Sequence, residues 1–438
     1  MRSLIRSLIC CSDERLCCTD EIHFMFKRNE AMTNMIKLAI RSPVYKMQYL
    51  YGKIRLKIKS RFYKAAVIML VIASLLVEGH SQSLAGGFNP NASNSVYALA
   101  TQTDGKIIAG GSFAQMGGQP RGGLARLNED GSLDSSFPNL SIGGMISPAV
   151  LAIAIQPDGK IIIAGQFTTV AGQRKNRIAR LNIDGSLDIG FNTDTNGTIY
   201  ALAIQPDGKI LLGGAFTEVN GQARSYIARL NEDGSLDKSF TSNTDGTVYT
   251  ITVHSDSTIF IGGAFNRVAE QKRSRLARLK PDGSLDMDFN PNADGDVLSI
   301  AVQSTGKILV GGNFSFIAGQ NKSYLAQLKA NGTIDHTFVA SPNAMVKTLL
   351  TQPDGKLLIA GFFTLVNGQP RRYITRLNPD GTLDSSFPDV NVDGGSFTRI
   401  LTLALQADGK IILGGRFTQI SGQPRNNIAR LSQDGKLN

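Results

Sequence analysis

Among the charged residues of the sequence, an arginine is repeatedly followed eight residues later by an aspartate. The pairs are Arg126/Asp134, Arg180/Asp188, Arg229/Asp237, Arg278/Asp286 and Arg376/Asp384. An arginine beside a carboxylate can mark an anion-binding site. Because the pair keeps one position in a repeated segment, we favour a structural role, in which each cross-strand pair contributes about 0.2–1 kcal/mol.

A second set of basic residues follows a recurring Gly-Gln-X motif, in which Glu270 replaces one of the glycines. The set consists of Arg121, Lys175, Arg224, Arg273, Lys322, Arg371 and Arg425. Seven like charges on one face would form an electropositive rim that could bind anionic glycans or acidic protein surfaces. The alternative is that each side chain hydrogen-bonds a main-chain carbonyl of a neighbouring repeat and is repeated for folding.

A third candidate site is a calcium loop, because several connections place Asp and Asn at alternate positions. The best match has Asp389, Asn391 and Asp393 followed by a glycine. Calcium takes about six to eight oxygen ligands. No acid stands at the two later positions that would complete the loop, Phe397 and Ile400, and turns rich in Asp and Asn explain the pattern without a metal. We expect no cofactor, with calcium as the weaker alternative.

Catalytic motifs are absent from the sequence after residue 81. That part has no cysteine, and its only histidines are His254 and His336, which stand singly. No metalloprotease, serine-hydrolase or nucleotide-binding motif is present. We therefore expect that the chain is not an enzyme.

These residues belong to a unit that repeats seven times. The units span about 96–137, 149–191, 199–240, 248–289, 297–338, 346–387 and 400–438. Within one copy, four short runs bounded by turn residues predict strands. These runs are Tyr200–Gln205, Lys209–Phe216, Ile227–Asn231 and Ser235–Phe240.

The turns of the unit predict how these strands pair. Asp-Gly turns favour hairpins with glycine in the left-handed region, and the register places Leu230 opposite Leu236. The second strand is apolar on both faces, so other sheets must cover it on both sides. The last unit ends early, and residues 83–88 match its missing strand. The sequence predicts an all-β, seven-bladed β-propeller with four antiparallel strands per blade, closed by the N-terminal strand.

The N-terminal segment carries most of the net charge of the chain. The formal charge is +11, but residues 1–81 hold 14 of the 46 basic and 6 of the 35 acidic side chains, together with all four cysteines. Residues 82–438 carry only a modest net charge and contain no tryptophan, which argues against nucleic-acid binding. The apolar run Ala65–Val77, after a basic stretch, predicts a secretory signal peptide over residues 47–81, cleaved near Ser81/Gln82.

The apolar run Ala65–Val77 is shorter than the roughly 20 apolar residues of a membrane-spanning helix, so we expect no stable transmembrane anchor. Residues 1–46 are interpreted as an over-long N-terminal extension, and residues 82–438 as the propeller. We expect the mature protein to be secreted or at the cell surface, and to be a monomer.

The repeats resemble the delta-60 repeat family of bacterial surface proteins. The resemblance rests on QPDGKIIIAGQF at residues 156–167 and RLNIDGSLDIGF at residues 180–191, and it covers residues 83–438. It implies a β-propeller in a secreted or cell-surface protein and brings no established activity.

Two hypotheses of function follow. The first is an exported, non-catalytic scaffold that binds a protein or glycan through loops on one rim, for binding or adhesion. The second is a secreted propeller enzyme that acts on carbohydrate, with acids at the axial mouth. Two carboxylates that converge at the axis within about 5–10 Å would favour the enzyme.

Overall fold

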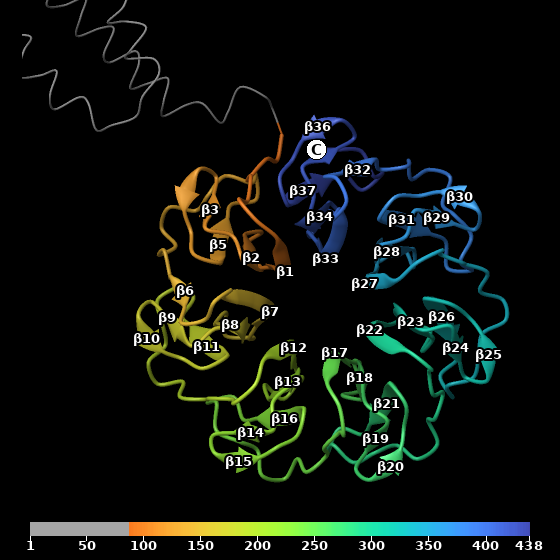
Figure 1. The fold of residues 1–438 in the computed structure, drawn as a ribbon, viewed down its shortest axis with the longest axis horizontal. Coiled ribbons are helices and arrows are strands. Elements are labelled where there is room, and N and C mark those ends of the chain that lie inside the picture. The colour runs from red at the N-terminus through yellow and green to blue at the C-terminus, as the bar shows by residue number, and fades with distance from the viewer. Residues whose placement is uncertain (1–86) are drawn as a thin grey trace, which may run out of the picture. The chain divides into compact units, whose positions relative to one another are not determined.

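The computed structural model describes residues 87–438, and the predicted extension and signal peptide lie outside these residues. Each of the seven repeats folds into a three-stranded antiparallel sheet, and Figure 1 shows these sheets arranged around a common centre. The described residues contain strands and turns but no helix. The predicted all-β propeller with seven repeats is confirmed.

The first strand of each sheet is the one nearest the centre (Figure 1). These inner strands are β1 (Val96–Thr101), β7 (Ala149–Ile155), β12 (Ile199–Ile204), β17 (Val248–Val253), β22 (Asp296–Val302), β27 (Val346–Thr351) and β33 (Arg399–Leu405). The middle strands are β2 (Ile107–Gly111), β8 (Ile161–Gln166), β13 (Ile210–Gly214), β18 (Ile259–Gly263), β23 (Ile308–Asn313), β28 (Leu357–Gly361) and β34 (Ile411–Arg416). The third strands are β5 (Leu124–Leu127), β11 (Ile178–Leu181), β16 (Ile227–Leu230), β21 (Leu276–Leu279), β26 (Leu325–Leu328), β31 (Ile374–Leu377) and β37 (Ile428–Leu431).

Between its middle and third strands, each repeat also forms a hairpin of two-residue strands. These pairs are β3 (Gln115–Met116) with β4 (Gln119–Pro120), β9 (Thr169–Val170) with β10 (Gln173–Arg174), β14 (Glu218–Val219) with β15 (Gln222–Ala223), β19 (Arg267–Val268) with β20 (Gln271–Lys272), β24 (Phe316–Ile317) with β25 (Gln320–Asn321), β29 (Leu365–Val366) with β30 (Gln369–Pro370), and β35 (Gln419–Ile420) with β36 (Gln423–Pro424). Two longer connections, residues 138–148 and 388–398, add a third strand to two of these hairpins: β6 (Ile142–Gly143) and β32 (Val392–Asp393).

The predicted fourth strand is reduced to a single bridge. Leu236 pairs with Leu230, in the predicted register. Beyond the bridge the chain turns, because the Asp237 carboxylate accepts a hydrogen bond from the Ser239 amide at 2.9 Å and the Asp237 carbonyl accepts one from the Phe240 amide at 3.4 Å. The turn directs Phe240 into the core, where it is fully buried.

Apolar side chains fill the space between neighbouring sheets. Every residue of the seven middle strands is buried except for the last residue of β8, β23 and β34, and the phenylalanine that ends each of the first six units is also buried. Glycine permits the close approach. A Cβ placed on Gly110 would lie 2.6 Å from Val150 Cγ1 of the next repeat, and one on Gly213 would lie 2.7 Å from Val248 Cγ1.

The first and last repeats make the same contacts as other neighbours (Figure 1). A Cβ on Gly414 would lie 2.9 Å from Val96 Cγ1, and the Thr101 hydroxyl donates to the Leu405 carbonyl at 3.2 Å. The centroid of the Phe88 ring lies 4.7 Å from the guanidinium carbon of Arg430, as the terminal phenylalanines of other repeats lie beside their arginines. Residues 83–86 of the predicted closing strand lie outside the described residues.

Replacing Gly213 by alanine should destabilise the fold by about 1–3 kcal/mol, because the new methyl group overlaps the Val248 side chain. Chemical denaturation measures the loss. Gly190→Ala is the matched control, since a Cβ there would meet only a carboxylate oxygen of Asp188, at 3.3 Å. Equal stability of the two variants would contradict the packing described here.

Candidate functional site

A β-bulge in every inner strand places one unpaired residue near the start of that strand. The strand-to-strand register skips this residue in all seven repeats. The seven bulged residues are Tyr97, Leu151, Tyr200, Tyr249, Leu298, Lys347 and Leu401. Bulges redirect a side chain away from the regular pleat. The rings of Tyr200 and Tyr249 lie edge to face with centroids 5.5 Å apart, so bulged residues of neighbouring repeats meet near the axis.

Lys347 is the only charged residue at these bulged positions, among leucines and tyrosines. Burial lowers the pKa of its ammonium group. Burial, together with the nearby Asp296 carboxylate, raises the pKa of Tyr249. Within the seven inner strands Asp296 is the only acid, so these strands contain no pair of carboxylates.

A groove of about 590 Å³ opens at this end of the inner strands, where repeats 7, 1 and 2 meet. We call it the axial groove; it is lined by Asn94, Ser95, Tyr97, Ser112, Phe113, Ala114, Gly122, Gly123, Ile142, Ile146, Ser147, Pro148, Ala149, Leu151, Gln166, Arg399 and Arg416. It combines two bulged residues, two arginines and the end of the 138–148 connection. Its size is that of a small-molecule site.

The sequence interpretation missed this groove, although a signal for it exists. Arg399 and Arg416 occupy positions where the second repeat has Ala149 and Gln166. A comparison of equivalent positions across the seven repeats would have shown that the residues departing from the repeat gather at one end of the inner strands.

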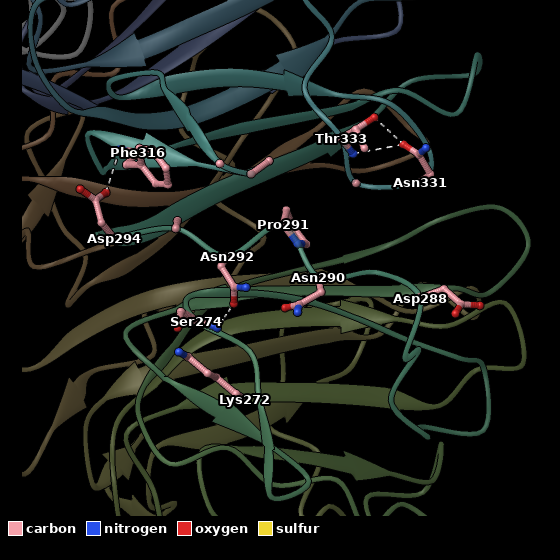
Figure 2. Close-up of a pocket in the computed structure, with 14 residues that line it drawn as sticks. Lys272, Ser274, Asp288, Asn290, Pro291, Asn292, Asp294, Phe316, Asn331 and Thr333 are labelled. Atoms are coloured by element: carbon pink, nitrogen blue, oxygen red, sulfur yellow. Dashed lines mark hydrogen bonds between the residues drawn. The ribbon is translucent and has the colours of Figure 1, made fainter.

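A second groove, of about 630 Å³, lies at the outer side between repeats 4 and 5 (Figure 2). Its polar groups are largely engaged in turns. The Asn292 side-chain oxygen accepts from the Ser274 amide at 2.8 Å, and an Asp294 carboxylate oxygen accepts from the Phe316 amide at 2.9 Å. This groove therefore offers fewer free polar groups than its composition suggests.

The seven predicted rim residues are not exposed: Lys175, Arg273 and Arg425 are buried, and the others are partly buried. Their side chains fold back onto the main chain. Lys175 donates to the Phe191 carbonyl at 2.5 Å, and Lys322 donates to the Phe338 carbonyl at 3.3 Å.

Each of the five arginines of this set donates to the carbonyl of the residue before it. These five are Arg121, Arg224, Arg273, Arg371 and Arg425. This geometry supports a structural role for the set, but the accepting carbonyls lie in the same repeat and not in a neighbouring one. The seven residues do not form an exposed basic surface.

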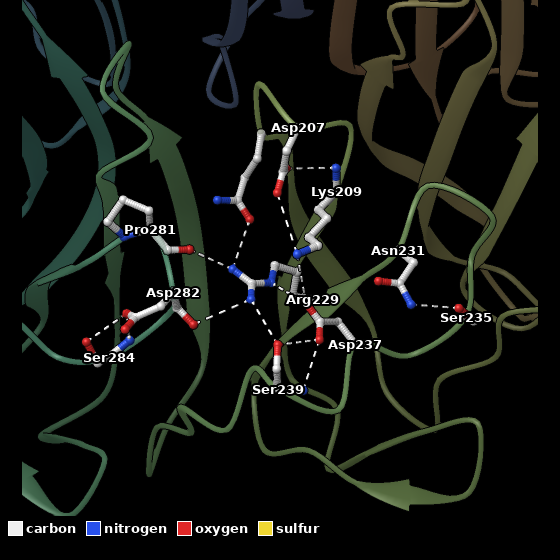
Figure 3. A network of polar contacts seen from close by, with 11 residues as sticks. Asp207, Lys209, Arg229, Asn231, Ser235, Asp237, Ser239, Pro281, Asp282 and Ser284 are labelled. Atoms are coloured by element: carbon white, nitrogen blue, oxygen red, sulfur yellow. Dashed lines mark hydrogen bonds and ion pairs between the residues drawn. The ribbon is translucent and has the colours of Figure 1, made fainter.

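The predicted Arg–Asp pairs are all present, and Figure 3 shows the one in the third repeat. Arg229 Nε lies 2.8 Å from an Asp237 carboxylate oxygen, and both side chains are buried. Arg229 Nη1 also donates to the carbonyl of Pro281, in the next repeat, at 2.7 Å. The arginine therefore holds the segment that follows the third strand against that strand and also joins neighbouring repeats.

The same arrangement recurs around the ring. The Nε–carboxylate distances are 2.8, 2.9, 2.8, 2.7 and 2.7 Å for the pairs of Arg126, Arg180, Arg229, Arg278 and Arg376. Each of these guanidinium carbons lies 4.6–4.9 Å from the centroid of the phenylalanine that ends its unit. Each arginine donates to a turn carbonyl of the next repeat. In the last repeat Arg430 pairs with Asn438 and donates to the Glu129 carbonyl of the first.

The pair of the fourth repeat, Arg278/Asp286, is present as predicted but is more exposed than that of the third repeat. Asp286 lies 2.7 Å from Arg278 Nε, but both side chains are only partly buried, each 19% exposed. In the third repeat a lysine and a serine also surround the equivalent carboxylate, whereas here Thr258 and Asp288 occupy those two positions. Solvent screens this pair and a second carboxylate stands near it, so it stabilises the ring less than the buried pairs do.

The fifth repeat also departs from this pattern, because Gln327 replaces the arginine. Gln327 donates to the Gln303 side chain at 3.1 Å, and Lys307 pairs with Asp335 at 2.7 Å. Between repeats 5 and 6 the Val339 amide donates to the Asp380 carbonyl at 2.9 Å.

The calcium candidates lie in the 388–398 connection, and their oxygens accept hydrogen bonds from Arg372 and from within the connection. The main-chain amide of Arg372 donates to Asp389 and its guanidinium to Asn391, each at 3.3 Å. Asp393 accepts from the Gly394 amide at 2.6 Å. Within residues 87–438 no group of three or more His, Cys, Asp or Glu side chains could hold a metal ion. The described part of the chain has no helix that is long and apolar enough to cross a membrane.

Comparison with known proteins gives a family match in all seven repeats. The family described as "Domain of unknown function (DUF5122) beta-propeller" matches residues 102–137, 156–191, 205–240, 254–289, 303–338, 352–387 and 406–438, together more than half of the chain. Comparison with curated proteins gives no match.

Several solved propellers are similar in fold. The WD40 β-propeller domain of Doa1 has a TM-score of 0.51 at 13% identity, with 75% of this chain and 93% of that one covered. A streptogramin B lyase has a TM-score of 0.49 at 15% identity, with 74% of this chain and 92% of that one covered. The virginiamycin B lyase of Staphylococcus aureus has a TM-score of 0.49 at 16% identity, with 74% of this chain and 94% of that one covered. At these identities the likeness shows the fold alone.

The expectation that the chain is not an enzyme is wrong. It rested on missing motifs alone. A propeller fold without familiar catalytic motifs is therefore no ground for excluding catalysis, and a scaffold role does not follow from it.

Replacing Arg229 by glutamine should lower the free energy of unfolding by about 2 kcal/mol at neutral pH, since the variant loses a buried charged hydrogen bond and a link to the next repeat. Lys209, 3.5 Å from Asp237, remains as a partial partner. Chemical denaturation measures the change, and Arg174→Gln, at an exposed arginine, is the control.

The same variant should be more sensitive to acid. Burial raises the pKa of Asp237, but hydrogen bonds from Ser239 and Arg229 outweigh it and lower the pKa to about 2 from 3.8. Because the pKa of Asp237 is lower in the folded protein than in the unfolded chain, its carboxylate stabilises the fold at pH values above the unfolded pKa. This contribution is lost as the pH falls toward 2. Arg229→Gln should raise the midpoint pH of acid unfolding, and an unchanged midpoint would contradict the assignment.

Chelation of calcium should leave the unfolding temperature unchanged, because oxygens of Asp389, Asn391 and Asp393 already accept hydrogen bonds, from Arg372 and from Gly394. Thermal unfolding with EDTA and with millimolar calcium provides the test. Asp393→Ala should lower the unfolding temperature equally in both conditions. Stabilisation by calcium that the variant abolishes would show that the loop binds the ion.

Proposed function

The chain belongs to the DUF5122 β-propeller family, and we propose that it is an exported module that binds a protein or glycan ligand in the axial groove. The observation that carries the proposal is the groove itself. Repeated residues elsewhere on the ring are explained by folding, because they bury themselves between sheets or bond the main chain. The groove also gathers residues that do not repeat, among them Ile146, Arg399 and Arg416.

The shape of the groove supports a binding role. The 138–148 connection, one of the two that lengthen the repeat, supplies one wall and brings Ile146, whose side chain is fully exposed. The opposite wall comes from Arg399 and Arg416. Apolar surface beside a few charged and polar groups is typical of ligand sites.

Export is supported by the sequence before residue 82, which has the pattern of a secretory signal peptide, and by the resemblance to the delta-60 repeats of bacterial surface proteins. We infer a mature protein of residues 82–438 that is secreted or held at the cell surface. In the same proposal the N-terminal segment completes the last of seven blades in a closed ring, and the protein is a monomer that binds no nucleic acid.

A binding screen tests the proposal. The purified full-length protein is screened against glycans and cell-envelope fractions, and the affinity of each bound ligand is then measured for two variants. Ser147→Trp should weaken binding at least tenfold, because Ser147 is exposed and lines the groove. Ser135→Trp, an exposed position outside the groove, should leave the affinity unchanged. Full affinity in Ser147→Trp would exclude the axial groove as the binding site.

A further inference from the structure

Two arginines face each other across neighbouring strands in the axial groove. Arg399 of β33 and Arg416 of β34 are direct partners in the strand register. Like charges directly opposite each other in a sheet are destabilising. The fold does not require this pair, since the equivalent residues are Ala149 and Gln166 in the second repeat.

No carboxylate neutralises this pair within the described residues. The ion pairs of arginines in residues 87–438 are those of Arg126, Arg180, Arg229, Arg267, Arg278 and Arg376. Moreover, Arg399 Nε is buried and has no hydrogen-bond partner. Six other arginines in this part of the chain also have a buried Nε without a partner, so it is the uncompensated pair of positive charges that points to a negative group that occupies the groove from outside.

Aromatic rings hold both guanidinium groups in place. The guanidinium carbon of Arg399 lies 5.6 Å from the centroid of Phe362, and that of Arg416 lies 4.9 Å from the centroid of Phe397. Such contacts restrict the planar groups and leave their N–H edges available. Restricted guanidinium groups lose little entropy when they bind a carboxylate with two parallel hydrogen bonds.

The rest of the groove favours a ligand rich in hydroxyl groups. Ser112 and Gln166 line the groove, and their side chains make no hydrogen bond with residues 87–438, so they are free to bind a ligand. Tyr97 adds an aromatic ring with a hydroxyl group. Sugar rings present apolar faces and hydroxyl groups together, which matches this lining better than a purely acidic peptide does.

We propose that the axial groove binds an acidic saccharide, with a uronate carboxylate held between Arg399 and Arg416. This inference rests on the proposed function and specifies the chemistry of its ligand. The two arginines provide the charge recognition, and Tyr97, Ser112 and Gln166 contact the sugar.

Calorimetry with matched saccharides tests the inference. The full-length protein is titrated with uronic-acid oligosaccharides and with the same oligosaccharides after methyl esterification, which removes the charge and keeps the sugar. The acid should bind at least tenfold more tightly than the ester, and its affinity should fall as salt is added.

Variants then locate the carboxylate. Arg416→Gln and Arg399→Gln should each weaken binding of the acid at least tenfold and leave binding of the ester unchanged. Arg174→Gln removes an exposed arginine outside the groove and should have no effect. Circular dichroism verifies that each variant is folded.

The possible failures are distinguishable. Equal affinity for acid and ester, or full affinity for the acid in both Arg399→Gln and Arg416→Gln, would overturn the inference. Tighter binding of an oligoglutamate peptide than of any uronate would overturn the saccharide assignment. If another ligand binds and Ser147→Trp abolishes its binding while no uronate binds, this inference fails and the proposed function stands. If no ligand is sensitive to Ser147→Trp, both fail.

Discussion

The ring depends on an arginine that lies in the third strand of a sheet and bonds the next sheet. Arg229 illustrates the geometry, with one carboxylate partner in its own repeat, one carbonyl partner in the next and a phenylalanine ring against its face. A buried guanidinium is stable only when its donors are satisfied. Because partners from two repeats are needed, the arginine ties the position of its sheet to that of the next one in every repeat except the fifth, where Gln327 replaces it.

This constraint separates the positions that build the ring from those that are free to vary. Glycines such as Gly213 must stay small because the neighbouring valine occupies the space. The bulged residues at the axis carry no such restriction, and they vary from tyrosine to leucine to lysine. A surface where repeats converge and their residues differ is suited to recognising an asymmetric ligand, and the axial groove lies there.

Much of the fold could be predicted because the repeat makes local signals consistent. The Asp-Gly turns defined the register of Leu230 with Leu236, and the eight-residue spacing defined the Arg–Asp pairs. The truncated fourth strand was missed because it depends on the side chain of Asp237, which caps a turn. The predicted basic rim was misplaced because spacing does not show where a long side chain ends: Lys175 turns back to the Phe191 carbonyl. The groove was missed because it is assembled from three repeats.

Hydrogen–deuterium exchange with and without a bound ligand tests the central claim, that recognition occurs where the inner strands of repeats 7, 1 and 2 meet. The account predicts that ligand binding slows exchange in residues 142–151 and 399–416, which wall the axial groove. Slowed exchange confined to residues 288–294, 316–319 and 331–333, which line the second groove, would contradict it.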